Sequence, residues 1–452
     1  MIYFQKMKIW AQKLHARIGD FWWYSLMIFM AARAADCLNV FVGLWLVPKY
    51  VPASELGAVQ PLMQFANFFA IPAAVFASTF RQELTGLAVK KEFGKMKTLM
   101  RSVFIATAVF FFLAIIVCHF VLPHFLTRIR VAEGSLGLLI LISSFLGVAQ
   151  PVYTNALQTM KRFREYSLIN LLCAPIRFLT MLAAMPFRAL SGYFVGQAST
   201  PAFTIAASVW SLRKDLAVKT EPYWTREIVR RFAGLFSLFL FGAIVGGASS
   251  LIEATVLRQR IPEVESAAYY MVTRFSDIAC FLYTALVFTI FPYAAEIAAK
   301  GKSANRLVVK TSLAILVTNI ALAAFFWFFG RQILAFLPNG ELYADYYWAI
   351  PWMIGIGSLT QFASFYTSAE LAANRLGYMW WTIPLTALYG AAMLLVSGYG
   401  YFTAYLPESW SAFLAAHNLT SLSAILWWMT IYRLVWLLCC FVHAKITKGN
   451  QP

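Results

Sequence analysis

Long apolar runs recur along the whole chain and are separated by short polar segments. A run of about twenty apolar residues crosses a bilayer as a helix, whereas a transmembrane barrel shows alternating segments of about ten residues. The pattern therefore predicts an all-α polytopic membrane protein with twelve transmembrane helices, six in each half of the chain. We expect them at 21–47, 57–80, 102–122, 134–157, 167–187 and 190–210, and again at 232–257, 267–298, 307–329, 346–369, 378–399 and 411–442.

The polar segments between these runs divide the chain into parts. The first twenty residues alternate basic and apolar positions, which is typical of an amphipathic segment that lies on a membrane surface. A polar, basic stretch in the middle of the chain indicates a linker between two lobes. The expected parts are the N-terminal segment 1–20, an N-lobe 21–210, a cytoplasmic linker 211–231, a C-lobe 232–443 and a cytoplasmic tail 444–452.

Composition agrees with a membrane protein, because 61% of the residues are hydrophobic and 12% are charged, with a mean hydropathy of +0.68. The net charge of +18 comes from short basic clusters between the apolar runs and not from one basic face. This distribution argues against a nucleic-acid partner. Most Lys and Arg residues fall on the side of the N terminus, and cytoplasmic loops are enriched in both residues. Both termini are therefore expected in the cytoplasm.

Two sets of residues suggest that the halves are copies of one another. Tyr153, Thr154, Ala156 and Arg162 recur 213 positions later as Tyr366, Thr367, Ala369 and Arg375. Each set closes an even-numbered helix of its half, which indicates a six-plus-six parallel repeat. In transporters built this way the substrate site lies between the lobes near the bilayer midplane.

No pattern of catalytic or metal-binding residues accompanies the apolar runs. The cysteines all fall within apolar segments, with no CxxC spacing, and we expect them to be packing residues: Cys37, Cys118, Cys173, Cys280, Cys439 and Cys440. The sequence has no HExxH motif and no Gly-rich phosphate loop. A membrane-embedded glycosyltransferase or polymerase is disfavoured, because the longest polar segment, the linker 211–231, is too short to house a sugar-nucleotide site. We expect no enzyme, no metal and no cofactor, apart from a possible coupling ion, H⁺ or Na⁺.

Six of the charged residues inside the expected spans are the candidate site residues. They are the substrate-binding candidates Arg33, Arg177 and Arg274, and the coupling or pairing candidates Asp36, Asp277 and Glu253. Charges inside a membrane are costly and often functional. The planar guanidinium makes bidentate, charge-assisted contacts with phosphate oxygens and stays protonated.

Two alternatives stay open for these residues. Asp36 and Asp277 each follow an arginine by three positions, on the same helical face, so each pair could be a structural ion pair. Glu253 could bind a cation or a proton, or it could be a polar residue at the rim of its helix.

Three stretches resemble a known family. The run 267–298 contains a tyrosine pair, Arg274 and a closing Phe-Pro; 157–170 reads LQTMKRFREYSLIN; and 191–196 reads SGYFVG. They are similar to the eighth helix, the turn between helices four and five, and the start of helix six of polysaccharide flippases. These flippases belong to the multidrug/oligosaccharidyl-lipid/polysaccharide exporter superfamily, which also includes multidrug and toxin extrusion antiporters and lipid II flippases.

The resemblance implies a transporter that flips a lipid-linked oligosaccharide, such as a polysaccharide or O-antigen (lipopolysaccharide) precursor, across the cell inner membrane by alternating access. The expected partners are the lipid-linked glycan, membrane lipids and other polysaccharide assembly proteins. The alternative is a cation-coupled multidrug antiporter of the same fold. The expected spans do not include the two extra helices of the lipid II branch. The aspartates beside the arginines predict a cavity that is less cationic than the one expected in that branch.

Overall fold

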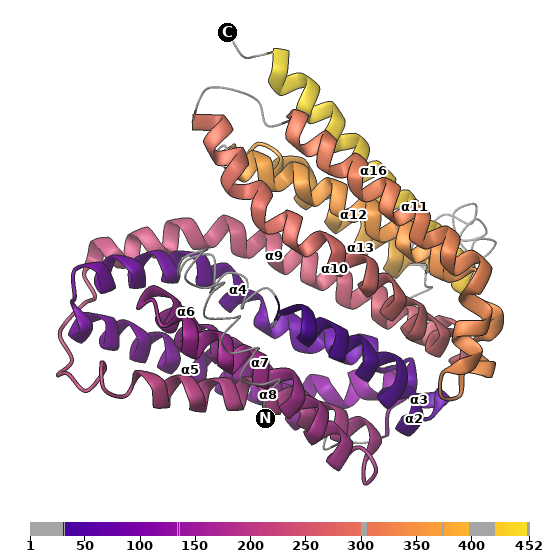
Figure 1. Cartoon of the computed structure of the whole chain (residues 1–452), viewed down its shortest axis with the longest axis horizontal. Helices are drawn as coiled ribbons and strands as arrows, with labels where there is room; N and C mark the ends of the chain where they lie inside the picture. The colour runs from indigo at the N-terminus through magenta and orange to yellow at the C-terminus, as the bar shows by residue number, and fades with distance from the viewer. Residues whose placement is uncertain are drawn as a thin grey trace, which may run out of the picture. The chain divides into compact units, whose positions relative to one another are not determined.

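The computed structural model describes residues 30, 32–132, 134, 136–299, 305–372, 375–396 and 421–449. Within these ranges every regular element is a helix (Figure 1). The expected amphipathic segment 1–20 lies outside the described residues, as do the start of the first span, the end of the eleventh span, the loop after it and the start of the twelfth span. The all-helical fold class is confirmed for the part of the chain that is described.

The first half of the chain begins with a helical stretch, 32–41, and continues as a π-helix. A π turn is frequent at functional positions of helices. The elements that follow are η1 (Val42–Leu46), α2 (Val47–Tyr50), α3 (Ala53–Leu56), α4 (Val59–Val89), α5 (Phe93–Arg128), α6 (Leu136–Thr159), α7 (Phe163–Ala184) and α8 (Ala189–Leu212).

The second half contains six long helices and two short 3₁₀ turns within the described residues. They are α9 (Arg226–Arg260), α10 (Glu263–Ala299), α11 (Asn305–Phe336), η2 (Gly340–Leu342), η3 (Ala344–Tyr346), α12 (Ala349–Ala372), α13 (Met379–Val396) and α16 (Leu422–Gly449).

Several helices extend past the apolar run that predicts them. The second span was expected to end near residue 80, but α4 continues to Val89, and α5 already begins at Phe93. The apolar run marks only the part that suits lipid, whereas the backbone hydrogen bonds of a helix can continue into water where Lys, Arg and Glu are solvated. The same reason explains why α9 begins at Arg226, inside the expected linker.

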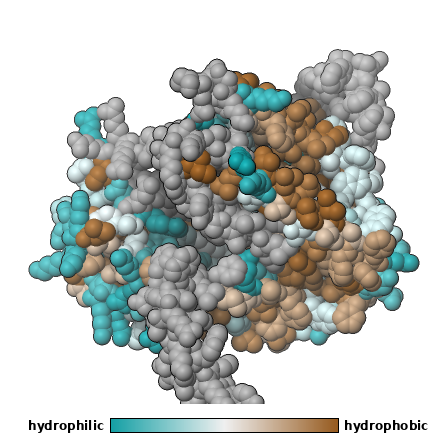
Figure 2. Space-filling view, turned by 45° about the horizontal axis from the view of Figure 1, so that its top comes forward, coloured by the Kyte–Doolittle hydropathy of each residue, from teal (hydrophilic) through white to brown (hydrophobic). Residues whose placement is uncertain are grey.

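Six helical segments of the described chain are long and apolar enough to cross a membrane. They are Phe93–Arg128, Leu136–Thr159, Phe163–Ala184, Leu240–Arg260, Arg306–Phe336 and Leu422–Ile446. Large apolar side chains are also exposed along these helices, and hydrophobic areas are prominent on the face drawn in Figure 2. Apolar side chains facing outward are what a lipid environment favours. The chain is therefore a multi-pass membrane protein.

The described helices pack as two compact units. Unit 1 combines the chain up to Phe41 with Pro72–His119 and Ser135–Phe236, and in it α8 packs against both α6 and α7. Unit 2 combines Val42–Ile71 and Phe120–Gly134 with the chain from Ser237 onward, and in it α12 packs against α10, α11 and α16. The division into lobes at the linker stays a prediction.

The turns that follow α6 and α12 close in the same way. The Arg162 amide donates to the Leu157 carbonyl at 2.9 Å, and the Arg375 amide donates to the Glu370 carbonyl at 2.9 Å. These four residues are related by the 213-residue offset found in the sequence. The internal repeat as a whole stays a prediction, with this pair of turns as a local feature in its favour.

Candidate functional site

Arg33 and Asp36 form an ion pair on the helical stretch 32–41 in unit 1. The Nη2 atom of Arg33 lies 2.9 Å from Oδ2 of Asp36, and each side chain is 25% exposed. Residues three apart share one face of a helix, so helix spacing brings the two side chains together. The exposed quarter leaves both groups within reach of water or of a ligand.

Arg177 joins three helical segments of unit 1. It follows Pro175 in α7, and its guanidinium donates to Oδ1 of Asn39 on the stretch 32–41 and to Oε1 of Gln197 on α8, the latter at 3.4 Å. The Gln197 amide in turn donates to the Tyr193 hydroxyl at 2.8 Å. Amide oxygens orient a guanidinium without cancelling its charge. This arrangement can hold a cation in place for an anionic ligand.

An apolar cavity of about 500 Å³ borders the same two segments of unit 1. Its lining consists of small and apolar side chains: Ala34, Ala35, Cys37, Leu38, Phe41, Leu171, Ala174 and Pro175. Arg33 directly precedes this set on one segment, and Arg177 lies two residues after its last member on the other. Unit 1 therefore carries apolar and cationic positions next to one another along both segments.

Arg274 is held by three groups in unit 2. Its Nη1 atom lies 3.1 Å from Oδ2 of Asp277, and its Nη2 donates to Oε1 of Gln60 on α4 at 3.2 Å. The guanidinium also lies 5.2 Å from the centre of the Tyr270 ring. A Cβ atom on Gly43 would approach Cδ of Arg274 to 2.9 Å, so a glycine in η1 makes room for the arginine stem. Asp277 is 42% exposed and stays available to a ligand.

Glu253 belongs to a network of aromatic side chains in unit 2. The Tyr389 hydroxyl on α13 donates to Oε2 of Glu253 on α9 at 2.5 Å. Tyr389 stacks on Tyr432 of α16 with ring centres 4.0 Å apart, and the Arg433 guanidinium lies 4.7 Å from the Tyr432 ring. Glu253 therefore has a specific hydrogen-bond partner in unit 2.

The structure brings together some of the predicted residues and not others. The contacts pair Arg33 with Asp36 in unit 1 and Arg274 with Asp277 in unit 2, as the sequence spacing predicts. Arg177 and Glu253 contact residues that the sequence analysis did not single out. Among the described residues, no group of three or more His, Cys, Asp or Glu side chains could hold a metal ion.

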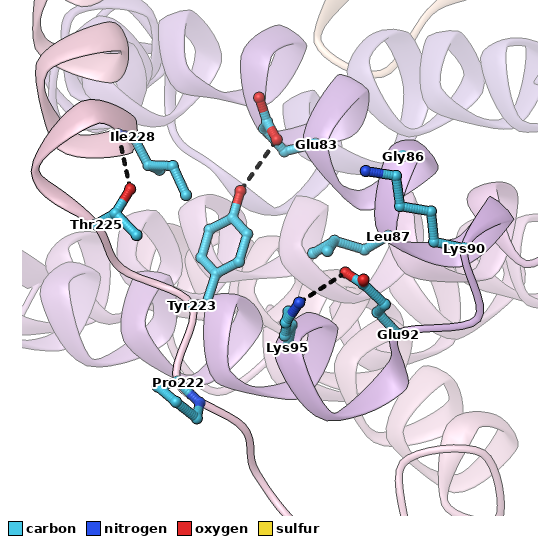
Figure 3. Close-up of a pocket in the computed structure, with 10 residues that line it drawn as sticks. All are labelled: Glu83, Gly86, Leu87, Lys90, Glu92, Lys95, Pro222, Tyr223, Thr225 and Ile228. Carbon is cyan, nitrogen blue, oxygen red and sulfur yellow. Dashed lines mark hydrogen bonds and ion pairs between the residues drawn. The ribbon is translucent and has the colours of Figure 1, made fainter.

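A second cavity, of about 340 Å³, lies at the linker end of unit 1 (Figure 3). The Tyr223 hydroxyl donates to Glu83 at 3.0 Å, and Lys95 pairs with Glu92 at 3.2 Å on its wall. Tyr223 is buried in the core cluster of unit 1, and Thr98 donates to the Glu221 carbonyl at 2.7 Å. None of the six candidate residues lines this cavity. The contacts of Glu221 and Tyr223 hold this part of the chain against α4 and α5.

Several partners in these networks escaped the sequence analysis. Asn39, Gln60, Gln197 and Tyr389 are the residues that position Arg177, Arg274 and Glu253. The amide residues carry a signal that could have been used, since a polar amide inside an apolar span usually has a partner. Tyr389 carries none, because tyrosine is common in membrane helices.

Comparisons with known proteins agree with this architecture. An inward-facing multidrug resistance MATE family transporter of the MOP superfamily has a TM-score of 0.63 and 13% identity, over 92% of this chain and 96% of that one. The lipid II flippase MurJ, in an inward closed conformation, has a TM-score of 0.61 and 13% identity, over 93% and 87%. A MOP superfamily transporter from Pyrococcus furiosus has a TM-score of 0.61 and 12% identity, over 94% and 95%.

No protein-family model matches the sequence, and no curated protein matches it. The structural likeness at these identities shows the fold. The chain has the fold of MOP superfamily transporters, in which drug transporters and a lipid flippase are both represented.

Proposed function

We propose that this protein is a transporter that flips a lipid-linked oligosaccharide, a precursor of a polysaccharide or O-antigen, across the inner membrane by alternating access. The observation that carries the proposal is Arg177, which is held by Asn39 and Gln197 and lies two residues along α7 from Pro175, a lining residue of the apolar cavity in unit 1. No covalent chemistry is required, because the protein changes only which side of the membrane its ligand faces.

The chemistry of the ligand matches these two features. A lipid-linked oligosaccharide carries a phosphate or diphosphate between its glycan and its lipid chain. Guanidinium groups contact phosphate oxygens in pairs, and a lipid chain favours apolar side chains such as those that line the 500 Å³ cavity. Arg33 and Arg274 would add contacts to the phosphate. The phosphate would compete with Asp36 for Arg33 and with Asp277 for Arg274.

The predicted topology determines the direction of transport. With twelve spans and both termini in the cytoplasm, the linker and the basic clusters face the side where lipid-linked precursors are assembled. Similarity of fold does not define which side of the membrane a loop faces, so the orientation rests on the charge distribution.

A second candidate, a cation-coupled drug antiporter, has its own supporting observation. Asp36 and Asp277 already bind cationic groups, and Glu253 accepts a short hydrogen bond inside a cluster of aromatic rings. A cationic drug could replace an arginine beside either aspartate, and aromatic faces attract cations. The two candidates require opposite signs of charge from the protein.

Charge-removing variants separate the two candidates. Arg177→Gln keeps polarity and removes the charge, so each lost charge-assisted contact should cost about 1.5–3 kcal/mol, which is a tenfold or greater loss of binding. Surface glycan should fall sharply in Arg177→Gln and should fall in Arg33→Gln and Arg274→Gln. Arg101→Gln is the matched control, because Arg101 is an exposed arginine on α5.

The same cells should be tested for efflux of a cationic dye at matched expression. The antiporter candidate predicts that efflux fails in Asp36→Asn and survives in the arginine variants. Loss of dye efflux in Asp36→Asn, together with normal surface glycan in all three arginine variants, would contradict the flippase proposal.

A further inference from the structure

Arg258 is a fully buried cation near the end of α9 in unit 2. Its side chain is 0% exposed, and it is one of the largest fully buried side chains of the described chain. Arginine is rarely buried to this degree unless its charge is balanced. The expected seventh span ends at residue 257, so the sequence places Arg258 just outside it. Burial at this position therefore needs a structural reason.

The reason is a pair of backbone carbonyls from two distant segments. Nε of Arg258 donates to the Ile129 carbonyl at 3.0 Å, and Nη2 donates to the Ser54 carbonyl. Ser54 lies in α3, and Ile129 directly follows α5. One guanidinium thus connects three segments that are far apart along the chain.

The Ile129 carbonyl is a favourable acceptor for a cation because it lies at the C terminus of a helix. The last turn of α5 closes with Arg130 in the left-handed region, at φ 58°, and with the Val131 amide donating to the Leu126 carbonyl at 3.0 Å. Carbonyls at a helix C terminus lack intrahelical partners and carry partial negative charge. Arg258 therefore caps α5 from another helix.

Other contacts at this end of unit 2 join the same segments. A Cβ atom on Gly57 would lie 3.0 Å from the backbone carbonyl carbon of Ser266 at the start of α10, so the two backbones touch. The Asn339 amide donates to the Pro48 carbonyl at 2.8 Å. These contacts again connect the segment 48–57 to the second half of the chain.

One nitrogen of the buried Arg258 guanidinium, Nη1, makes no hydrogen bond among the described residues. The charged groups that act on the guanidinium are Glu263, Arg130 and Glu55, and Arg130 itself pairs with Glu263 at 3.6 Å. A buried N–H group without an acceptor favours any state in which water can reach it. The unpartnered Nη1 group therefore offsets part of the stability that the two carbonyl contacts provide.

We propose that Arg258 is a latch: its guanidinium holds the α3 segment and the end of α5 against the end of α9, and its release opens this end of unit 2 during the transport cycle. The latch rests on the proposed alternating-access function, in which the side opposite the linker must open to release the ligand. The latch binds no external ligand, because its hydrogen-bond acceptors are the protein's own carbonyls at Ser54 and Ile129.

The test measures access to this end of the molecule and needs no substrate. In a cysteine-free protein, Gln60→Cys introduces a single reporter thiol near the start of α4. This position contacts Arg274 and follows the latch residue Ser54 closely in the sequence. Right-side-out vesicles are treated with a membrane-impermeant maleimide, and the labelling rate is measured with and without Arg258→Gln. We expect at least tenfold faster labelling in Arg258→Gln. Arg260→Gln removes an exposed arginine two residues away and should label at the rate of the parent.

A second variant guards against misfolding. Arg258→Lys keeps the charge and most of the stem but replaces the planar fork, so its labelling rate should fall between those of the parent and Arg258→Gln. Hydrogen exchange of the α5 C-terminal amides, including Arg130 and Val131, should speed up in both variants, because the cap is weakened.

Parent-like labelling in Arg258→Lys and in any folded Arg258→Gln protein would overturn the latch. Failure of the flippase proposal would leave these rates unchanged, since neither measurement involves a transported molecule.

Discussion

Each of the two intramembrane aspartates lies three positions after an arginine and pairs with it. The geometry follows from helix periodicity alone, because side chains at i and i+3 share a face. What differs is the surroundings. Arg274 is also bound by Gln60 and lies beside the Tyr270 ring, whereas Arg33 and Asp36 are equally exposed. The Arg33–Asp36 pair, in which both side chains are 25% exposed, is used to test whether such a pair is structural.

Charge removal at Arg33 and Asp36 tests this point. Either single change, Arg33→Gln or Asp36→Asn, leaves one charge in a partly buried site and should lower stability by about 1–3 kcal/mol. If the pair is only structural, the double variant should recover most of that loss and retain transport. The apparent melting temperature in detergent measures the first effect, and glycan export measures the second. A stable double variant without export would assign the pair to the transport site.

At the scale of single elements, glycines decide how closely helices approach. In the SGYFVG stretch at the start of α8, a Cβ atom on Gly192 would lie 2.5 Å from the Met185 amide nitrogen and 2.6 Å from the Ala184 carbonyl carbon. Backbone atoms cannot move aside as a flexible side chain can. The tight turn between α7 and α8 therefore requires glycine at this position.

A pair of glycine substitutions measures that requirement. Gly192→Ala should lower stability by about 1–3 kcal/mol, because the added methyl overpacks the turn. Gly147→Ala in α6 is the matched control: nothing lies within 4 Å of its added Cβ, so the change should be neutral or stabilising by about 0.5–1 kcal/mol. Melting temperatures of the purified proteins compare the two. Equal effects would show that the turn can relax around a methyl group.

At the scale of the whole molecule, the open question is which side of the membrane each loop faces. The uneven distribution of Lys and Arg predicts that the linker and both termini are cytoplasmic. Reporters fused near Lys219 and at the C terminus should therefore report the cytoplasm, and a reporter near Pro262 should report the outside. Finding Lys219 and Pro262 on the same side would refute the twelve-span topology and, with it, the direction assigned to the latch.

The sequence by itself determined the class of protein and the local charge pairs. Apolar runs of membrane-spanning length predict helices because an unpaired backbone group in lipid is too costly, and every regular element of the described chain is a helix. The Arg33–Asp36 and Arg274–Asp277 pairs follow in the same way, since contacts within one helix depend only on spacing.

Only the tertiary structure decided which residues from different helices meet. The partners of Arg177 and Glu253 lie 138 and 136 positions away in the chain, at Asn39 and Tyr389, and no local rule connects positions so far apart. Burial of Arg258 was likewise invisible in the sequence, because an arginine at the end of an apolar run reads as a solvated loop charge. Its guanidinium is held by two backbone carbonyls, at Ser54 and Ile129. Because every residue carries a backbone carbonyl, the sequence cannot show which carbonyls will accept hydrogen bonds from an arginine.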